Sequence, residues 1–303
     1  SISYYCANAI LDYIRDPDGN IVSIFDEFYS TSAEVMRKNL FISAKKGIYS
    51  AYFIMTGDYS TLRLDYEKPK AYNIGEVIKH EDPIVPTGDL PNVAEAIVEI
   101  YEIKVKTGQA IRPYFKTLSR TQQVSLSYPS GEGHGYSFHS VNSSGNEPPI
   151  IIPKDGSAYF TIKRDQPSVY NAQPNTYIFA LSDINVESIS IDWVTRIRVQ
   201  PLGVESTRVF FINLLSSGTL LFNHTVIQND PDVGYTTYPS HFLKYIRNST
   251  VRDLAPIMYT PMDSDHCYYH VRAGTYYFMI SSTTPAGEGV VDMRISLFPD
   301  NEI

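Results

Sequence analysis

The sequence has little that would cross-link the chain, cross a membrane or carry much charge. It holds only two cysteines, Cys6 and Cys267, among 303 residues. No run approaches the roughly 18 continuous apolar residues of a membrane-spanning helix, and we expect no secretory leader. Charged residues make up 19% of the chain, below the roughly 25% that is usual. A chain of this length can bury a large hydrophobic core without disulfide bonds to stabilise it. We therefore expect two free buried thiols, with a Cys6–Cys267 disulfide as the alternative.

Clustered positive charge is also missing. The net charge is −8 at pH 7, and the longest basic run is the pair Lys45–Lys46. Proteins that hold nucleic acid by its phosphates need many Lys and Arg side chains gathered on one face. The composition therefore argues against a general affinity for nucleic acid.

The common catalytic and cofactor motifs are absent. The chain has no G-x-S-x-G elbow, no P-loop, no G-x-G-x-x-G fingerprint and no H-E-x-x-H zinc motif. The glycine-rich residues 131–135 are not followed by a helical pattern, so no helix N-terminus faces a phosphate there. We expect no catalytic residue, no cofactor and no metal. An acid pair of a β-sandwich hydrolase stays open, with Glu132, Asp192, Asp232 and Asp263 as undistinguished candidates.

Two acidic segments have the composition of metal loops without the spacing. Asp263-Ser264-Asp265-His266 and residues 16–20 both lack the twelve-residue calcium pattern, so we expect solvated turns. His266 and His270 would share a strand face about 13 Å apart. That separation is too large for one ion.

Turn and strand chemistry is what the sequence has in abundance. It holds 24 tyrosines, which belong on half-buried sheet surfaces and at interfaces. In residues 16–20, Pro17 presets φ and Gly19 supplies a positive φ, and the extended segments on both sides predict a hairpin. The one helix that we expect spans 31–43, because Thr31 and Glu34 have capping-box spacing.

From residue 47 onward, strand-like segments alternate with loops rich in Pro, Gly, Ser and Asn. In 98–106 and 189–199, apolar and polar residues alternate with the period of a strand that has one solvent-exposed face, with one break at Tyr101–Glu102 and one exception at Val194. Eight strands are expected before residue 203, over 48–55, 61–65, 96–106, 111–115, 122–128, 158–163, 176–181 and 188–199. Further strands are expected over 207–214 and 219–227, paired as a hairpin, and over 273–280 and 289–297.

These elements predict an all-β protein in two parts. Eight antiparallel strands with long loops and one short helix are typical of a jelly-roll sandwich, which we place at 1–203 with an N-terminal extension. Residues 201–203 mark the boundary, and 204–303 are expected to form a smaller C-terminal β-sandwich. A single large sandwich that includes the terminal strands is the alternative.

Six side chains are candidate surface or ligand contacts: His134, His139, Tyr235, Tyr238, Tyr268 and Tyr269. The two histidines lie in the long loop of 129–149, and an imidazole there could respond to pH near neutrality. The four tyrosines are the aromatic groups that a sugar-binding sandwich would present. Tyrosine serves equally well in packing and in subunit contacts.

Four features together resemble the jelly-roll capsid proteins of small icosahedral picorna-like viruses, including those that infect insects. They are the start at Ser1, as after polyprotein cleavage; the capped helix of 31–43; the eight strands with long loops; and the basic–apolar alternation of 189–199 before Pro201. An ordinary chain start is the alternative explanation of Ser1.

The resemblance covers 1–203 and implies a shell domain there, with 204–303 as a projecting domain. It implies a structural protein that is not an enzyme and uses no cofactor. Such a subunit assembles with copies of itself and with sister capsid subunits into an icosahedral shell around the viral RNA, with little direct contact to nucleic acid. A host receptor is a further candidate partner. The location is the virion, assembled in the host cytoplasm.

Two other functions fit the same elements. A carbohydrate-binding or adhesive module, such as a phage tail or surface lectin, would present an exposed aromatic platform. A β-sandwich hydrolase would hold two acids across a cleft.

Overall fold

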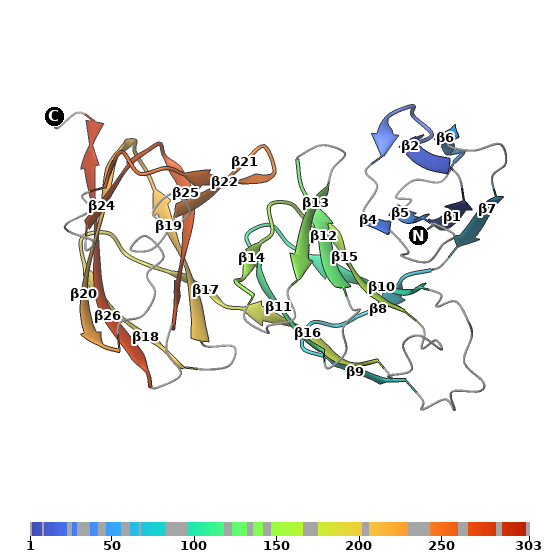
Figure 1. Cartoon of the computed structure of the whole chain (residues 1–303). Helices are drawn as coiled ribbons and strands as arrows, with labels where there is room; N and C mark the ends of the chain where they lie inside the picture. Colours follow the sequence, from blue (N-terminus) through green and yellow to red (C-terminus); the bar gives the residue numbers. More distant parts are fainter. Residues whose placement is uncertain are drawn as a thin grey trace. The chain divides into compact units, whose positions relative to one another are not determined.

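The computed structural model is built almost entirely from β-strands (Figure 1). It describes residues 2–7, 9–22, 26–28, 37–41, 47–55, 61–66, 68–82, 96–117, 123–131, 136–141, 147–165, 175–201, 206–229, 243–259, 266–282 and 287–300. The predicted all-β class is confirmed. Within these residues no helix is long and apolar enough to span a membrane.

The strands fall into three consecutive groups along the chain. The first group is β1 (Ile2–Ala7), β2 (Ala9–Arg15), β3 (Ile21–Val22), β4 (Asp26–Phe28), β5 (Arg37–Phe41), β6 (Ser50–Met55) and β7 (Thr61–Tyr66). The second is β8 (Lys70–Ala71), β9 (Val77–Glu81), β10 (Ala96–Val105), β11 (Ala110–Thr117), β12 (Gln123–Pro129), β13 (Tyr136–Val141), β14 (Ile150–Ile151), β15 (Gly156–Asp165) and β16 (Thr176–Ile184). The third is β17 (Val186–Ser188), β18 (Val194–Val199), β19 (Thr207–Leu214), β20 (Gly218–Gln228), β21 (Leu243–Arg247), β22 (Thr250–Leu254), β23 (Met258–Tyr259), β24 (His266–Val271), β25 (Gly274–Ser281) and β26 (Gly289–Pro299).

The second group has the strand order of a jelly roll. Its sheets run β14-β11-β16-β9 and β13-β12-β15-β10-β8. If β9 to β16 are counted as strands 1 to 8, the two sheets read 1-8-3-6 and 2-7-4-5, the order produced by two Greek keys wound into one sandwich. The short strand β8 is an addition that pairs parallel with β10 at the sheet edge.

The third group repeats the same order. Its sheets run β18-β26-β20-β24-β23 and β17-β19-β25-β21-β22. Without the short edge strands β17 and β23, the eight remaining strands again give 1-8-3-6 and 2-7-4-5. The C-terminal β-sandwich predicted from the sequence is therefore itself a jelly roll.

The first group follows part of this order. Its sheets run β4-β5-β1-β7 and β3-β2-β6. Counting β1 as strand 3, β2 as 4, β3 as 5, β5 as 6, β6 as 7 and β7 as 8 reproduces the neighbours 8-3-6 and 7-4-5. Equivalents of strands 1 and 2 are not among the described strands. In the complete rolls these two strands lie beside strands 8 and 7, the positions that β7 and β6 hold here at the sheet edges.

The helix predicted over 31–43 is wrong for the residues that the structure describes. Strand β5 occupies Arg37–Phe41 and pairs antiparallel with β1 on one side and β4 on the other. Thr31 and Glu34 lie outside the described residues. Two flanking strands outweigh a local capping pattern, because helix propensity is a weak prior that tertiary context overrides.

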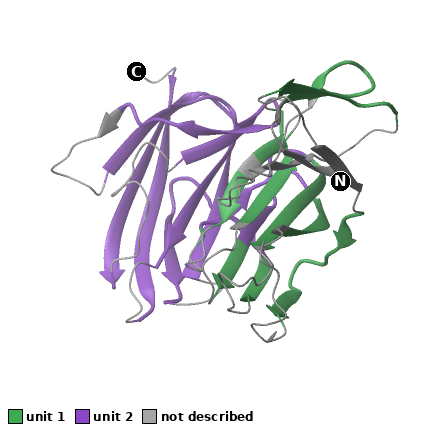
Figure 2. Cartoon of the chain, turned by 45° about the vertical axis from the view of Figure 1, so that its right-hand side comes forward, with its two compact units in different colours: residues 1–105, 113–147, 155–181 green, residues 106–112, 148–154, 182–303 purple. Residues whose placement is uncertain are grey.

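The chain divides into two compact units (Figure 2). Unit 1 comprises 1–105, 113–147 and 155–181, and unit 2 comprises 106–112, 148–154 and 182–303. The domains predicted from composition were 1–203 and 204–303. In the compact units, residues 182–203 group with the C-terminal part.

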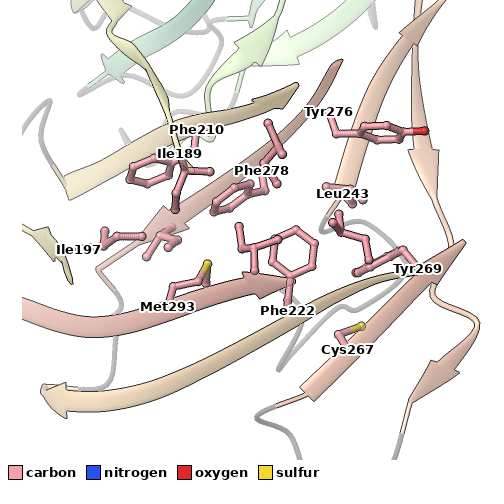
Figure 3. Packing of buried hydrophobic residues seen from close by; sticks show 14 of the residues in the cluster. Ile189, Ile197, Phe210, Phe222, Leu243, Cys267, Tyr269, Tyr276, Phe278 and Met293 are labelled. Atoms are coloured by element: carbon pink, nitrogen blue, oxygen red, sulfur yellow. The ribbon is translucent and has the colours of Figure 1, made fainter. Parts of the chain in front are cut away.

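The core of unit 2 lies between the two sheets of the third group (Figure 3). Phe222 and Phe278 come from opposite sheets and meet edge to face, with ring centroids 5.4 Å apart. Val291, Met293 and Ile295 are buried at alternate positions of β26, as the predicted alternation requires. Cys267 is a free, buried thiol in this core, which confirms that prediction for this cysteine.

Two strand predictions in unit 2 are corrected. Residues 188–199 are not one strand, because a turn with Asp192 at φ 67° separates β17 from β18 and places them in different sheets. The strands β19 and β20 are not a hairpin either, since β19 pairs with β25 and β20 pairs with β24 and β26. In both places the chain crosses from one sheet of the sandwich to the other.

The core of unit 1 is rich in aromatic side chains. Phe160 stacks on Tyr101 with centroids 4.6 Å apart and meets Phe179 at 4.3 Å. Ile103 and Val105 are buried on the same face of β10 as Tyr101, as the alternation of 98–106 predicts. Val98 and Ile100 are buried on the opposite face with Tyr159 packed against them, so the solvent-exposed face predicted for this strand is wrong over its first half.

Candidate functional site

The predicted contact residues do not gather in one place. His134, Tyr235 and Tyr238 lie outside the described residues. His139 lies on β13, and its side chain is 30% exposed. The Nε2 atom of His139 is 3.1 Å from a carboxylate oxygen of the buried Glu147. The imidazole therefore has a carboxylate partner of its own.

The neighbouring tyrosines of β24 point in opposite directions. Tyr269 is fully buried in the core, where its ring meets Phe222 edge to face at 5.7 Å, so it offers no surface to a ligand. Burial raises the pKa of Tyr269 far above its usual range. Tyr268 is half-buried on the outer face of the sheet, opposite Leu221 of β20. Of the four tyrosine candidates, Tyr268 is the one that the structure places on a described surface.

Residues 16–20 form the predicted hairpin turn between β2 and β3. One carboxylate oxygen of Asp16 accepts hydrogen bonds from the backbone N–H groups of Asp18, at 2.9 Å, and Asn20, at 2.8 Å. The carboxylate thus stabilises the turn. Across the described residues no group of three or more His, Cys, Asp or Glu side chains is arranged to hold a metal ion.

Sequence reasoning missed a pocket in unit 2. It lies beside the hairpin β21–β22 and the turn that joins β24 to β25, and has a volume of about 410 Å³. A second hollow of about 310 Å³ shares Tyr245 and Arg247 with it and extends to Asn248 and Arg252. The lining residues of the larger pocket are Tyr245, Ile246, Arg247, Leu254, His270, Arg272, Ala273, Gly274, Thr275 and Tyr276.

The hairpin β21–β22 positions one side of this pocket. Asn248 and Ser249 both have positive φ, 52° and 56°, as the two-residue type I′ turn of a tight hairpin requires. The pairing sets Tyr245 opposite Arg252, so both side chains lie on one face of the hairpin. Lys244 and Asp253 are paired on the other face, with Nζ and Oδ1 2.5 Å apart.

Tyr276 forms part of the pocket floor and is held rigidly. Its hydroxyl donates to the backbone oxygen of Arg272 and accepts from the backbone N–H of the same residue, both at 3.0 Å. The ring of Tyr245 lies 5.8 Å from that of Tyr276. Two aromatic rings therefore meet where the exposed side chains of Arg247, His270 and Arg272 form the rim.

Unit 1 holds a buried polar cluster around two carboxylates. Asp82 accepts hydrogen bonds from the Asn175 side chain at 2.7 Å and from Arg164, and contacts Nε2 of His80 at 2.7 Å. Glu99 accepts from Lys70 at 2.8 Å and from the hydroxyl of Tyr177 at 2.6 Å.

Each of these two carboxylates is stabilised in its charged form by its own hydrogen-bond donors and cations. Burial raises the pKa of Asp82, but the hydrogen bonds from His80 and Asn175 and the charge of Arg164 outweigh it and hold the pKa below its ordinary value. The pKa of Glu99 is likewise lowered, since its contacts with Lys70 and Tyr177 outweigh burial. A general acid needs a raised pKa. Neither carboxylate has one.

An exposed apolar corner is the other notable surface feature. Trp193, the single tryptophan of the chain, is 73% exposed, and the adjacent Val194 is 63% exposed. The backbone N–H of Asp192 donates to the carbonyl of Ile295 at 2.6 Å, which fixes the turn. The alternation of 189–199 places Trp193 on the apolar side of the predicted strand, together with Ile189 and Ile191. The sheet crossing at Asp192 turns it outward instead.

Comparisons with known proteins give no family. No family model and no curated protein matches the chain. Among solved structures, the chain is similar to the human MASP-1/3 CUB1-EGF-CUB2 segment, at 9% identity over 73% of this chain and 99% of that one, with a TM-score of 0.20. It is also similar to two virus structures. One is described as a triple jelly roll fold and turret assembly in an archaeal virus, at 10% identity over 96% and 76% of the two chains. The other is from Sulfolobus Turreted Icosahedral Virus, at 12% identity over 97% and 79%.

Both virus matches have a TM-score of 0.20. Superpositions of that quality carry no functional argument, so the strand order within this chain is the firmer evidence of the jelly-roll fold. The picorna-like resemblance stays a prediction.

Proposed function

We propose that the chain is a structural subunit of a virus particle. The observation that carries the proposal is the jelly-roll strand order, complete in β9–β16, complete again in β18–β26 and partial in β1–β7. Viral capsids are among the assemblies built from this fold. Rolls in tandem supply stiff, repeated wedges with loops at their ends, which suits assembly by side-to-side contact.

The surface of unit 2 supports an assembling role. Trp193 and Val194 are exposed side by side, and tryptophan is enriched among the residues that dominate binding at interfaces. Leu215, at a turn between the two sheets, is 92% exposed. Isolated apolar residues on a surface are ordinary, but an adjacent Trp–Val pair on a fixed turn is a good anchor for a neighbouring subunit.

The finer parts of the proposal follow the resemblance stated from the sequence. The subunit joins copies of itself and sister subunits in an icosahedral shell or its surface projections, encloses the genome with little direct nucleic-acid contact, and resides in the virion after assembly in the host cytoplasm. We further propose that it has no catalytic activity, supported by the paired, low-pKa state of Asp82 and Glu99.

A carbohydrate-binding or adhesive module is the alternative, and the aromatic pocket of unit 2 favours it. The two functions differ in the assembly state that they require. An adhesive module is complete as a monomer or small oligomer, whereas a capsid subunit is not.

The first test is the mass of the native assembly, measured by light scattering on material from the natural source. A megadalton particle that contains this chain and nucleic acid supports the capsid proposal. A stable monomer or trimer from that source contradicts it.

The Trp193 corner gives a second test. Trp193→Ala should weaken self-association at least tenfold, because interface tryptophans often contribute 2 kcal/mol or more, about a thirtyfold change. Trp193→Phe retains an aromatic anchor and should weaken it less. Sedimentation equilibrium of both variants makes the measurement, with circular dichroism as the control for folding. Unchanged association of Trp193→Ala would remove this corner from the interface.

A further inference from the structure

We propose that the pocket beside β21–β22 and the β24–β25 turn binds an acidic saccharide, meaning a sugar ring that carries a carboxylate or sulfate. The proposal concerns a ligand site of unit 2 and does not depend on the assembly state. The volume of the pocket, about 410 Å³, is within the range of pockets that enclose small organic ligands.

The charge of the pocket is opposite to that of the chain. The net charge is −8, yet the pocket is lined by Arg247, Arg272 and His270, and among the described residues that line it there is no carboxylate. The hollow that shares Tyr245 and Arg247 adds Arg252. Arginine forks match a carboxylate or sulfate with two parallel hydrogen bonds. The pocket therefore selects a negatively charged group.

The hairpin register keeps the nearest acid away from this site. Asp253 lies on the opposite face from Tyr245 and is paired with Lys244 there. The neighbouring residues of β22 thus present Arg252 to the pocket side and Asp253 away from it. The carboxylate of Asp253 therefore lies on the far side of the hairpin from an anion bound beside Tyr245.

The floor of the pocket is suited to a ring. Tyr245 and Tyr276 place two aromatic rings 5.8 Å apart, and Leu254 adds an apolar wall. Tyr276 is only 6% exposed and its hydroxyl is used by the backbone of Arg272, so it acts as a fixed support for the half-buried Tyr245, whose ring is the one that a ligand can contact. An apolar floor below a cationic rim matches a sugar, which has an apolar face of C–H groups and a charged substituent at its edge.

The layout argues against a nucleic-acid strand as the ligand. A strand is followed by a stripe of basic residues with successive stacking rings. Here the arginines surround one pocket, and elsewhere on unit 2 Arg196 and Arg208 are engaged with Asp292 and Glu187. A single acidic ring fits this arrangement better than a polymer backbone.

The test compares the binding of two matched pairs of acidic and neutral sugars to the full chain. Binding of 3′-sialyllactose and of lactose is measured by isothermal titration calorimetry, alongside a disaccharide of glucuronic acid and its glucose counterpart. At least one acidic sugar should bind about tenfold or more tightly than its neutral partner. The difference should shrink as salt is raised from 50 mM to 500 mM, because exposed charges are screened.

Substitutions locate the site. Arg272→Gln and Arg247→Gln should each weaken binding of the acidic sugar about tenfold. Tyr245→Leu should also weaken binding of the acidic sugar while leaving the fold intact. Arg196→Gln is the matched control, since this exposed arginine lies on β18 outside the pocket, and it should leave binding unchanged. Thermal unfolding of each variant controls for folding.

Three outcomes would overturn the assignment. One is equal affinity for acidic and neutral sugars, or no binding of either. Another is acidic-sugar binding that survives both arginine substitutions. The last is inorganic phosphate or adenosine monophosphate binding as tightly as the acidic sugar, which would make the pocket a general anion or nucleotide site.

Discussion

Asp82 shows how a single residue ties distant segments of unit 1 together. Asp82 follows β9 directly, and its carboxylate contacts His80 on that strand, Arg164 on β15 and Asn175 just before β16. The Asp82 side chain is 6% exposed and that of Arg164 is 11% exposed. A charge removed from water to this degree is tolerated because its partners satisfy it.

We predict that Asp82→Asn lowers the free energy of unfolding by about 3 kcal/mol at pH 7, because Arg164 loses its buried counter-charge. The folded pKa of Asp82 is below its ordinary value of 3.8. Its stabilisation is therefore complete above about pH 4 and is lost as the pH falls through the folded pKa.

Urea unfolding of the wild type and the variant at pH 7 and near pH 2 makes the measurement. The gap between them should be large at pH 7 and small near pH 2. Asp292→Asn, which breaks an exposed pair with Arg196, is the control and should cost much less. A gap that is independent of pH would show that Asp82 acts through packing and not through its charge.

At the residue scale the sequence was informative where local chemistry decides the outcome. The turn of residues 16–20 was predictable because Pro17, Gly19 and the Asp16 carboxylate act within five positions. The exposure of Trp193 was not predictable, since its alternation with Ile189 and Ile191 fits a buried strand equally well. The pocket was missed because Tyr245 and Tyr276 come together only through the pairing of β21 with β25.

The hairpin β21–β22 is the element on which the pocket depends. Its type I′ turn places Ser249 at φ 56°. A left-handed conformation costs an ordinary L-residue about 1 kcal/mol or more, whereas glycine adopts it freely.

Ser249→Gly should therefore raise the stability of the protein by about 0.5 kcal/mol, after the extra entropy of glycine in the unfolded chain is subtracted. Thermal unfolding measures the change. Ser216→Gly is the matched control, because Ser216 has no positive φ and its substitution should destabilise. A destabilised Ser249→Gly would indicate that the serine side chain supports the hairpin in another way.

Element prediction succeeded where alternation was long and uninterrupted. Residues 289–297 alternate cleanly and form most of β26, whereas β10 was recognised although its alternation breaks at Tyr101–Glu102. The helix at 31–43 failed because a capping pattern competes poorly with two strand partners. The hairpin expected from 207–227 failed because a short turn between two strands is equally able to connect opposite sheets.

For the whole molecule, the sequence indicated the jelly-roll class but not the allocation of strands to rolls. Of the eight strands expected before residue 203, those at 48–55 and 61–65 belong to the N-terminal sheets as β6 and β7. The short strands β9, β13 and β14 were not recognised. Strand order depends on pairings between residues about 100 positions apart, which local patterns do not report.

The strand order gives a prediction for the whole chain. Strand β26 lies between β18 and β20 and supplies Val291, Met293 and Ile295 to the core. A chain that ends at residue 286 should therefore lose the cooperative unfolding of unit 2, because the sheet is left with a gap between β18 and β20. Limited proteolysis should cut it within 207–282, whereas a chain that ends at residue 300 should resist. Equal resistance of both chains would contradict the central role of β26.

The pairing of first and last strands also determines when each roll can form during synthesis. Val194 of β18 pairs with Arg294 of β26, and Val77 of β9 pairs with Ala180 of β16. Contacts of such long range delay folding, since the loop must close before the pairing stabilises anything. A nascent chain that has emerged only as far as β25 contains β18 and β20 but lacks β26, the strand that lies between them in the sheet. The eleven residues of β26 complete the sheet once they occupy the position between these two strands.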